Sequence, residues 1–305
     1  GYGDLGVLFQ KQRKGVQLKT IREQSGETRT TGLDNDTVCQ FVSSDPDLAE
    51  AVNAATEEFE VLHREFPELM KLGEMEQVEA IEKHLVNFYA DDTVNPYVSM
   101  AARGPWIITT KGAVLHDNGG YGMLGFGHVP EPIIAAMTKP QVMANVMTPS
   151  FAQLKLSNAL AREIGQTHTG GCPFSHFVAM NSGSESVSVA TRIADVNAKI
   201  LTDEGGRHAG KPVKKMSLSG GFHGRTGRPA MFSDSCRGSY DKYLASFRTE
   251  ELLTVEPNDI GDLETHFTKA DEDGYFIEAL FIEPVMGEGN PGVAITPEFY
   301  IAARE

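Results

Sequence analysis

An apolar segment, a turn rich in glycine and serine, and an amphipathic helical pattern follow one another between residues 177 and 201. The apolar segment at 177–180 has the length and composition of a short strand. Beyond the turn, apolar residues recur at helical spacing on one face, namely Val187, Ala190, Ala194, Ala198 and Leu201. Strand, tight turn and helix in this order form the building unit of parallel α/β sheets. This stretch therefore restricts the fold more than any other.

The turn at 181–184, with sequence NSGS, has the properties of an anion site. The first backbone N–H groups of a helix have no intrahelical partner, and the helix dipole favours negative charge there. The hydroxyls of Ser182 and Ser184 flank Gly183 at this position, an arrangement that suits a phosphate. An alternative is that Ser182 and Glu185, spaced as S-x-x-E, form only a capping box that closes an ordinary helix.

Two further predicted strands run into loops that combine glycines with charged residues. The segment 216–218 precedes SGGFHGRT at 219–226, and the segment 275–283 precedes PVMGEG at 284–289. With helices between the strands, one of them over 259–270, the pattern predicts a mostly parallel sheet flanked by helices. Ligands in such sheets bind at the carboxyl ends of the strands, where all three loops would lie. This shared position favours an anion site over capping alone.

The N-terminal third has a different pattern of polar and apolar residues. Residues 1–44 are polar and show no clear periodicity, which predicts an irregular or extended arm. Apolar stripes then predict a helix over 46–66 and a second helix after Gly73. The expected inner face of that second helix consists of Val78, Ile81, Leu85 and Phe88.

A predicted β-hairpin leads into a loop rich in glycine. Segments 106–109 and 113–116 flank Lys111 and Gly112, a pattern typical of a hairpin. The loop DNGGYGMLGFGH follows and contains G-x-G-x-x-G, but it lacks the strand–turn–helix context of a dinucleotide site. Glycines of this density indicate close backbone approach or a tight path around a ligand. Tyr121 within this loop is either a substrate contact or an ordinary loop aromatic.

Helices are also predicted at 133–137 and 151–164, the second with Leu154, Leu160 and Ile164 facing inward. Between that helix and the strand at 177–180 lie His168, Cys172 and His176 at a metal-like spacing. No fourth ligand is evident, so we predict no metal site.

The composition limits the functional classes to which this protein can belong. Acidic residues outnumber basic ones by 42 to 27, giving a net charge of −15, which disfavours binding to nucleic acid or to an anionic membrane. No apolar run has the length of a membrane span, and no signal pattern opens the chain. The odd number of cysteines, three, argues against a disulfide framework and favours a reducing compartment, the cytoplasm. The chain starts without Met and stops within a predicted helix that begins at 296, so we expect it to be part of a longer polypeptide.

Taken together and in order, these motifs resemble the class III (ω-type, ornithine/GABA-like) pyridoxal-phosphate-dependent aminotransferases of fold type I. The resemblance rests on GGY at 119–121 with GH at 127–128, NSGSES at 181–186, FHGRT at 222–226 and EPVMGEG at 283–289. It covers roughly residues 95–305 and leaves the first 90 or so unexplained.

The resemblance implies a fold and a domain organisation. The fold class is α/β, a mostly parallel sheet flanked by helices that forms an incomplete large domain, plus an N-terminal small-domain segment. For residues 1–94 the residue patterns alone predict an N-terminal arm and helical extension. By the resemblance, residues 95–148 would be the small-domain hairpin and glycine-rich active-site loop. Residues 149–305 would be the N-terminal part of the large domain that binds pyridoxal phosphate.

The resemblance also implies roles for single residues. The cofactor would be bound by Ser182, Gly183, Ser184, Phe222, His223 and Glu283, and the substrate by Tyr121, Arg225 and Glu288. The phosphate would rest at the helix N-terminus, Phe222 would lie flat on the pyridine ring, and Glu283 would support the ring from behind. Arg225 would pair with a substrate carboxylate, although relatives also use this arginine only structurally. Glu288 resembles the acidic residue that masks a carboxylate-binding arginine.

The family's Schiff-base lysine and ring-nitrogen aspartate lie beyond the last motif, in a part that this sequence does not include, so the catalytic residues are unknown. The implied function is transfer of an amino group between an ω- or α-amino acid and a keto acid, by a homodimer or higher oligomer. Alternatives are a non-catalytic fragment or pseudoenzyme that acts as a binding or assembly module, and an aminomutase or decarboxylase of the same family.

Overall fold

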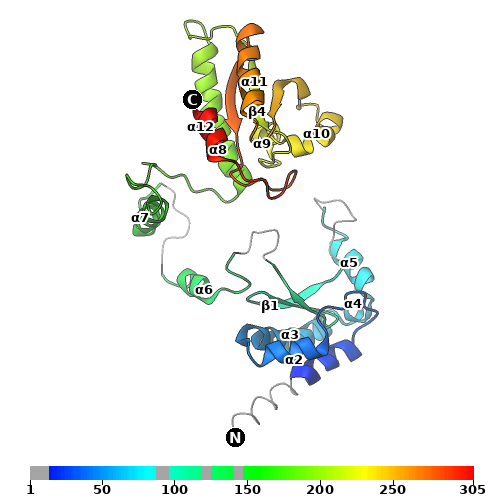
Figure 1. Ribbon diagram of the computed structural model, residues 1–305. Coiled ribbons are helices and arrows are strands. Elements are labelled where there is room, and N and C mark those ends of the chain that lie inside the picture. Colours follow the sequence, from blue (N-terminus) through cyan, green and yellow to red (C-terminus); the bar gives the residue numbers. More distant parts are fainter. Residues whose placement is uncertain (1–13, 87–95, 119–124, 141–146) are drawn as a thin grey trace. The chain divides into compact units, whose positions relative to one another are not determined.

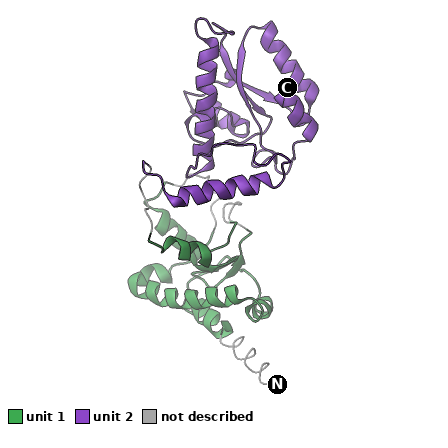
Figure 2. Ribbon diagram, turned by 90° about the vertical axis from the view of Figure 1, so that its left-hand side faces the viewer, with its two compact units in different colours: residues 1–146 green, residues 147–305 purple. Residues whose placement is uncertain are grey.

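The computed structural model describes residues 14–86, 96–118, 125–140 and 147–305. Its contacts divide the chain into two compact units, Gly1–Val146 (unit 1) and Met147–Glu305 (unit 2), coloured separately in Figure 2. Along the described residues, no helix combines the length and the apolar character that crossing a bilayer requires.

Unit 1 packs helices against a small antiparallel sheet. The strands, in spatial order, are β1 (Ser99–Arg103), β2 (Trp106–Thr109) and β3 (Val114–His116). The helices are residues 14–23, α2 (Asn35–Val42), α3 (Pro46–Glu65), α4 (Pro67–Lys71), α5 (Glu74–Glu82) and α6 (Glu131–Met137). The long helix α3 packs on β1 and β2, as Figure 1 shows, and its face supplies much of the core.

The predicted hairpin is confirmed. Trp106 lies opposite His116, and Ile108 lies opposite Val114, in antiparallel register. The turn between these strands contains Gly112 at φ +70°, a conformation that residues with a Cβ rarely adopt. The hairpin places Ile108 and Val114 in the hydrophobic core beneath α3.

The prediction that residues 1–44 form an irregular arm is wrong for the part that the structure describes. Residues 14–23 and α2 are helical. Leu18, Ile21 and Val38 are buried against the same core as α3. Their apolar positions are too sparse to give a local helical signal, so these segments are helical because α3 and the sheet bury them.

The predicted inner face of the second helix is also wrong. In α5 the buried residues are Glu74 and Gln77, whereas Val78 is only half-buried and Ile81 is 43% exposed. Leu85 lies beyond the end of α5 and is 68% exposed. Glu74 Oε2 accepts hydrogen bonds from the backbone N–H groups of Arg29 and Thr30, each 2.7 Å. The polar face of α5 therefore points inward, because it satisfies backbone N–H groups of the neighbouring segment at residues 29 and 30. Phe88 lies outside the described residues.

Unit 2 contains a parallel sheet of strand order β5-β4-β6, which confirms the predicted α/β class. Its strands are β4 (Val213–Leu218), β5 (Leu252–Val255) and β6 (Phe276–Phe281). The α-helices are α7 (Phe151–Gly165), α8 (Gly183–Thr202), α9 (Gly227–Ala230), α10 (Arg237–Tyr243), α11 (Ile260–Glu272) and α12 (Pro297–Arg304). Short 3-10 turns occur at η2 (Asp234–Cys236) and η3 (Thr249–Glu251).

Helices cover both faces of this sheet. Ile277 of β6 packs in a cluster with Leu263 of α11 and Phe299 of α12. The next residue, Glu278, points to the opposite face because side chains alternate along a strand. There it pairs with Arg228 of α9, which also contacts α8 through an ion pair. Helix α8 therefore lies on one face of the sheet, and α11 and α12 lie on the other (Figure 2).

Two predictions about unit 2 are wrong. Residues 177–180 are not a strand, because no strand of the described chain pairs with them. Helix α7 forms where expected but buries none of its residues, and Leu154, predicted to face inward, is 52% exposed. The strand β5 was not predicted from the sequence. The predicted domain division at 1–94, 95–148 and 149–305 stays a prediction.

Candidate functional site

Three loops meet at one edge of the unit 2 sheet. Strands β4 and β6 are parallel, so the loops 219–226 and 282–289 that follow them leave from the same edge. These loops touch, because a Cβ on Gly289 would collide with the backbone oxygen of Gly220. The turn at 181–184, which precedes α8, forms the third part of the site.

Ser182 is the N-cap of α8, and its Oγ accepts a hydrogen bond of 3.2 Å from the backbone N–H of Glu185. The Glu185 carboxylate accepts one of 2.8 Å from Asn181 N–H, one residue before the position that a capping box uses. Capping leaves the N–H groups of Gly183 and Ser184 at the start of the helix without intrahelical partners. Nothing lies within 4 Å of the side-chain position of Gly183, so the turn has open space beside it. The cap and an anion site are therefore compatible.

Gly224 joins the second loop to the start of α8. Its φ is +116°, and a Cβ at this position would lie 2.5 Å from Ser184 Oγ and 3.1 Å from Ser184 Cα. A larger residue would push the loop away from the helix. The FHGRT loop thus lies directly on the NSGS turn.

Glu283 fixes the second loop relative to the third. Its Oε1 accepts a hydrogen bond of 2.6 Å from Phe222 N–H, and its Oε2 accepts one of 2.8 Å from Gly287 N–H. A single carboxylate thereby sets the positions of both loops. Phe222 itself is half-buried.

His223 is buried between the site and the sheet, with 8% of its surface exposed. Its backbone N–H donates to Ser233 Oγ at 2.9 Å, and its ring meets Phe281 edge-on with centroids 5.6 Å apart. The ring atom Nε2 is buried and has no hydrogen-bond partner among the described residues. Burial lowers the pKa of His223, and the nearby Glu283 carboxylate opposes this shift only in part. The imidazole is therefore neutral at pH 7.

Arg225 and Glu288 form an ion pair between the second and third loops. Arg225 Nη2 lies 3.1 Å from Glu288 Oε1 and 3.3 Å from Oε2. The guanidinium carbon lies 5.3 Å from the centre of the Phe222 ring, within range of a cation–π contact. The structure thus brings together eight of the nine residues that the sequence singled out: Ser182, Gly183, Ser184, Phe222, His223, Arg225, Glu283 and Glu288.

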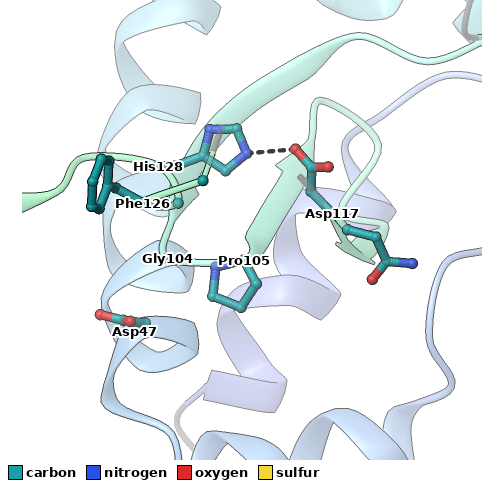
Figure 3. Close-up of a pocket in the computed structure, with 9 residues that line it drawn as sticks. Asp47, Gly104, Pro105, Asp117, Phe126 and His128 are labelled. Atoms are coloured by element: carbon teal, nitrogen blue, oxygen red, sulfur yellow. Dashed lines mark hydrogen bonds and ion pairs between the residues drawn. The ribbon is translucent and has the colours of Figure 1, made fainter. Parts of the chain in front are cut away.

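The ninth, Tyr121, lies outside the described residues. The ends of its loop border a cavity of about 440 Å³ in unit 1, shown in Figure 3. There His128 Nε2 lies 3.0 Å from Asp117 Oδ2, and Phe126 and Asp47 line the same space.

Sequence reasoning missed three residues around the site. Ser233 is fully buried, and its Oγ lies 3.0 Å from the carbonyl oxygen of Gly224 as well as binding His223 N–H. Asp234 accepts a hydrogen bond of 2.8 Å from Gly220 N–H. Burial of the Tyr240 hydroxyl and, to a smaller extent, the nearby Cys236 thiol raise the pKa of Tyr240 to about 12. The hydroxyl has no hydrogen-bond partner among the described residues. No sequence pattern marks these residues, because their roles depend on the fold of the loop.

The described residues contain no group of three or more His, Cys, Asp or Glu side chains arranged to hold a metal ion. His168, Cys172 and His176 are therefore not gathered into a site. Cys172 Sγ lies 3.4 Å from the carbonyl oxygen of Phe174, and His176 Nδ1 lies 2.8 Å from Ser175 Oγ.

Solved structures share this fold. The ornithine aminotransferase from Toxoplasma gondii ME49 is similar with 19% identity and a TM-score of 0.58, covering 79% of this chain and 53% of that one. An aminotransferase from Vibrio fluvialis is 17% identical with a TM-score of 0.53, covering 76% of this chain and 53% of that one. An ω-aminotransferase from Paracoccus denitrificans is 19% identical with a TM-score of 0.51, covering 74% of this chain and 53% of that one. The chain spans about half the length of each of these structures.

The family described as Aminotransferase class-III matches residues 88–305, which include all nine residues above. That match covers more than two thirds of the sequence and begins close to the point where the motifs begin. The chain belongs to the class III aminotransferase family.

Proposed function

We propose that this chain supplies the cofactor-binding loops of a pyridoxal-phosphate-dependent enzyme that transfers an amino group between an ω- or α-amino acid and a keto acid. The observation that carries the proposal is the contact of Gly224 with Ser184, which unites the NSGS turn and the FHGRT loop. A helix N-terminus beside an aromatic side chain and the half-buried Glu283 carboxylate suits a phosphorylated aromatic cofactor.

The residues present fit pyridoxal phosphate. Ser182, Gly183 and Ser184 would hold the phosphate through hydroxyls and N–H groups at the open start of α8. Phe222 would contact the ring face, and Glu283 would keep Phe222 in place through its backbone N–H. The Nε2 atom of His223 is buried and has no hydrogen-bond partner among the described residues, so it could bind a polar group of the cofactor.

The substrate side would be formed by Tyr121, Arg225 and Glu288. Arg225 is a guanidinium held over an aromatic ring, which suits a carboxylate of an amino acid or keto acid. When bound, pyridoxal phosphate supplies an electron sink for bond cleavage at the substrate carbon. The chain's own contribution is to orient the cofactor and to fix the carboxylate of the substrate relative to it.

The test is the affinity for pyridoxal phosphate of the variants Gly224→Ala and Gly238→Ala, measured by equilibrium dialysis and by quenching of tyrosine fluorescence. A Cβ at Gly224 would strike Ser184, so we expect its affinity to fall by about tenfold or more. Gly238 lies in α10 with nothing within 4 Å of its side-chain position, so its variant should bind as the wild type does. Equal affinities for wild type and Gly224→Ala would contradict the proposed cofactor site.

We further propose a homodimer or higher oligomer in the cytoplasm. Three unpaired cysteines agree with a reducing compartment, and apolar side chains exposed on α7 and α8 agree with an oligomer interface. Sedimentation equilibrium at micromolar concentration tests the oligomer, and a monomer at all concentrations would exclude it.

A further inference from the structure

A buried serine lies behind the FHGRT loop. Ser233 follows α9 and is fully buried. Its Oγ accepts a hydrogen bond of 2.9 Å from the backbone N–H of His223. The same atom lies 3.0 Å from the carbonyl oxygen of Gly224 and 3.0 Å from that of Pro229. Because a hydroxyl can accept and donate at the same time, Ser233 binds the loop backbone on both sides of the peptide bond between His223 and Gly224.

These bonds are the backbone hydrogen bonds at this point of the loop. Within the part of the chain that the structure describes, neither the N–H of His223 nor the carbonyl of Gly224 has another hydrogen-bond partner. Phe222, one residue earlier, is bound separately by Glu283. Loss of the Ser233 hydroxyl would therefore leave the buried N–H of His223 unpaired, unless the loop moved to pair it elsewhere.

Gly224 connects this serine to the start of α8. Its φ is +116°, and a Cβ at this position would lie 3.1 Å from Ser184 Cα. Ser184 is the second residue of α8, so its backbone N–H has no intrahelical partner. Ser233 therefore fixes the position of the loop relative to a residue whose N–H and hydroxyl are placed to bind an anion.

Aromatic packing holds the surroundings of Ser233 independently of its hydroxyl. The Phe281 ring of β6 contacts both Phe232 and His223, with centroids 4.3 Å and 5.6 Å apart. Phe232, the neighbour of Ser233 in the sequence, is fully buried. None of these contacts involves Ser233 Oγ, so we expect removal of the hydroxyl to release the loop backbone and to leave the core intact.

We propose that Ser233 is a positioning residue of this site, whose hydroxyl holds Gly224 against Ser184 and thereby sets the affinity for a phosphate group at the start of α8. Ser233 is buried too deeply to touch a ligand, so it acts through the loop. Without the hydroxyl the loop also occupies other positions, and only the fraction of molecules with the loop in place binds the ligand tightly. The inference rests on the proposed function in taking the ligand to be a phosphorylated pyridine.

The test measures the dissociation constant of pyridoxine 5′-phosphate by equilibrium dialysis, under conditions in which circular dichroism shows every variant to be folded. This probe has the ring and the phosphate but no aldehyde, so it does not attach to lysines. Ser233→Ala should bind it about tenfold more weakly than the wild type. Ser217→Ala is the matched control, because Ser217 is equally buried in unit 2 and its Oγ has no hydrogen-bond partner among the described residues. We expect this control to change the dissociation constant by less than about twofold.

Hydrogen–deuterium exchange of the peptide that contains residues 222–226 measures the positioning itself. In the absence of ligand, Ser233→Ala should exchange faster there than the wild type, because the N–H of His223 loses its acceptor. Ser217→Ala should exchange in this peptide as the wild type does. Should Ser233→Ala fail to fold, Ser233→Cys decides, since a thiol fills the space of the hydroxyl but accepts hydrogen bonds weakly. Weaker binding by Ser233→Cys supports the inference, and wild-type binding overturns it.

Unchanged affinity in Ser233→Ala would overturn the inference, as would an equal loss of affinity in Ser217→Ala. Weaker binding without faster exchange at 222–226 would also overturn it, because the effect would then not act through the loop. A wild type that binds no pyridoxine 5′-phosphate contradicts the proposed function and this inference with it. Unchanged binding in Ser233→Ala beside a wild type that does bind contradicts the inference alone.

Discussion

Helix α3 in unit 1 and helix α7 in unit 2 have similar local signals and different surroundings. Both start at a side-chain cap, Asp45 for α3 and Ser150 for α7, and both have apolar residues on one face. Helix α3 buries five residues against its own unit, namely Leu48, Ala51, Val52, Ala55 and Phe59. Helix α7 buries none, and its apolar face borders an open groove of about 660 Å³ beside residues 177–179.

The contrast separates what a local pattern determines from what it does not. Caps and periodicity are enough to define a helix, because they act within a few residues. Burial depends on a partner surface, which for α3 is the sheet of β1 and β2. A second apolar row in unit 2, Ile193, Val196 and Ile200 on α8, is also exposed in the described chain. Unit 2 therefore presents faces that have the composition of a core without its contacts.

Leucine truncations should give the largest difference between the two helices. Leu48→Ala removes a side chain with 0% exposure, so we expect it to destabilise unit 1 by about 2–5 kcal/mol. Leu154→Ala removes one that is 52% exposed, so we expect a loss of less than about 0.5 kcal/mol. Urea unfolding followed by circular dichroism measures both.

Tryptophan fluorescence separates unit 1 from unit 2 in this experiment, because Trp106 is the single tryptophan and lies in the unit 1 core. A cost of several kcal/mol for Leu154→Ala would contradict the exposed position of α7. Such a result would show that a partner covers this face in solution, and its dependence on protein concentration would identify a second copy.

The site could be located from the sequence because its parts are loops with unusual composition. The NSGS turn, FHGRT and EPVMGEG each follow an apolar segment. The parallel strands β4 and β6 bring FHGRT and EPVMGEG to one edge of the sheet, and the NSGS turn adjoins them through the contact of Gly224 with Ser184. The contact of Gly224 with Ser184 and the bond of Glu283 to Phe222 N–H could not be predicted, because they join residues tens of positions apart. The buried Ser233 had no signal at all, since its role is to accept a backbone N–H within a folded loop.

The errors in the fold have one physical origin. Residues 177–180 have the composition of a strand, yet a strand exists only when a neighbour completes its hydrogen bonds. Glu74 and Gln77 in α5 are polar and nevertheless buried, because backbone and side-chain groups of other segments need their hydrogen bonds. In each case tertiary partners, which the local sequence does not contain, decide the outcome.

An ion pair in the unit 2 core should give an intermediate effect. The Glu278 carboxylate, with 2% of its side chain exposed, bonds Arg228 Nη2 at 2.6 Å on the face of the sheet that α8 covers. Arg228→Met leaves that carboxylate buried without its charged donor, so we expect unit 2 to lose about 1.5–3 kcal/mol. Arg207→Met, at an exposed position, is the control and should cost less than about 0.5 kcal/mol.

The Arg228→Met variant measures how much this ion pair contributes to holding α8 and α9 on the sheet. Arg228 also contacts Asp195 of α8 at 3.3 Å, so its loss frees two elements from β6. Wild-type stability in Arg228→Met would mean that hydrocarbon contacts alone fix this face. Recovery of stability in the double variant Arg228→Met with Glu278→Leu would instead identify the unpaired carboxylate as the cause of the loss.

The smallest expected effect is a pH dependence in unit 2 from His223. Burial lowers the pKa of His223 below its ordinary value, so the unfolded chain binds more protons than the folded one between these two values. Stability then rises with pH in this window and is lost as pH falls below about 6.5.

The buried Glu278 acts in the opposite direction, because its raised pKa makes unit 2 lose stability as pH rises through its titration. Urea unfolding of His223→Asn between pH 5 and 7, compared with His168→Asn at an exposed position, isolates the histidine contribution. A curve for His223→Asn as steep as that of the wild type would mean that another group carries the proton, and that the orphaned Nε2 is already bonded in solution.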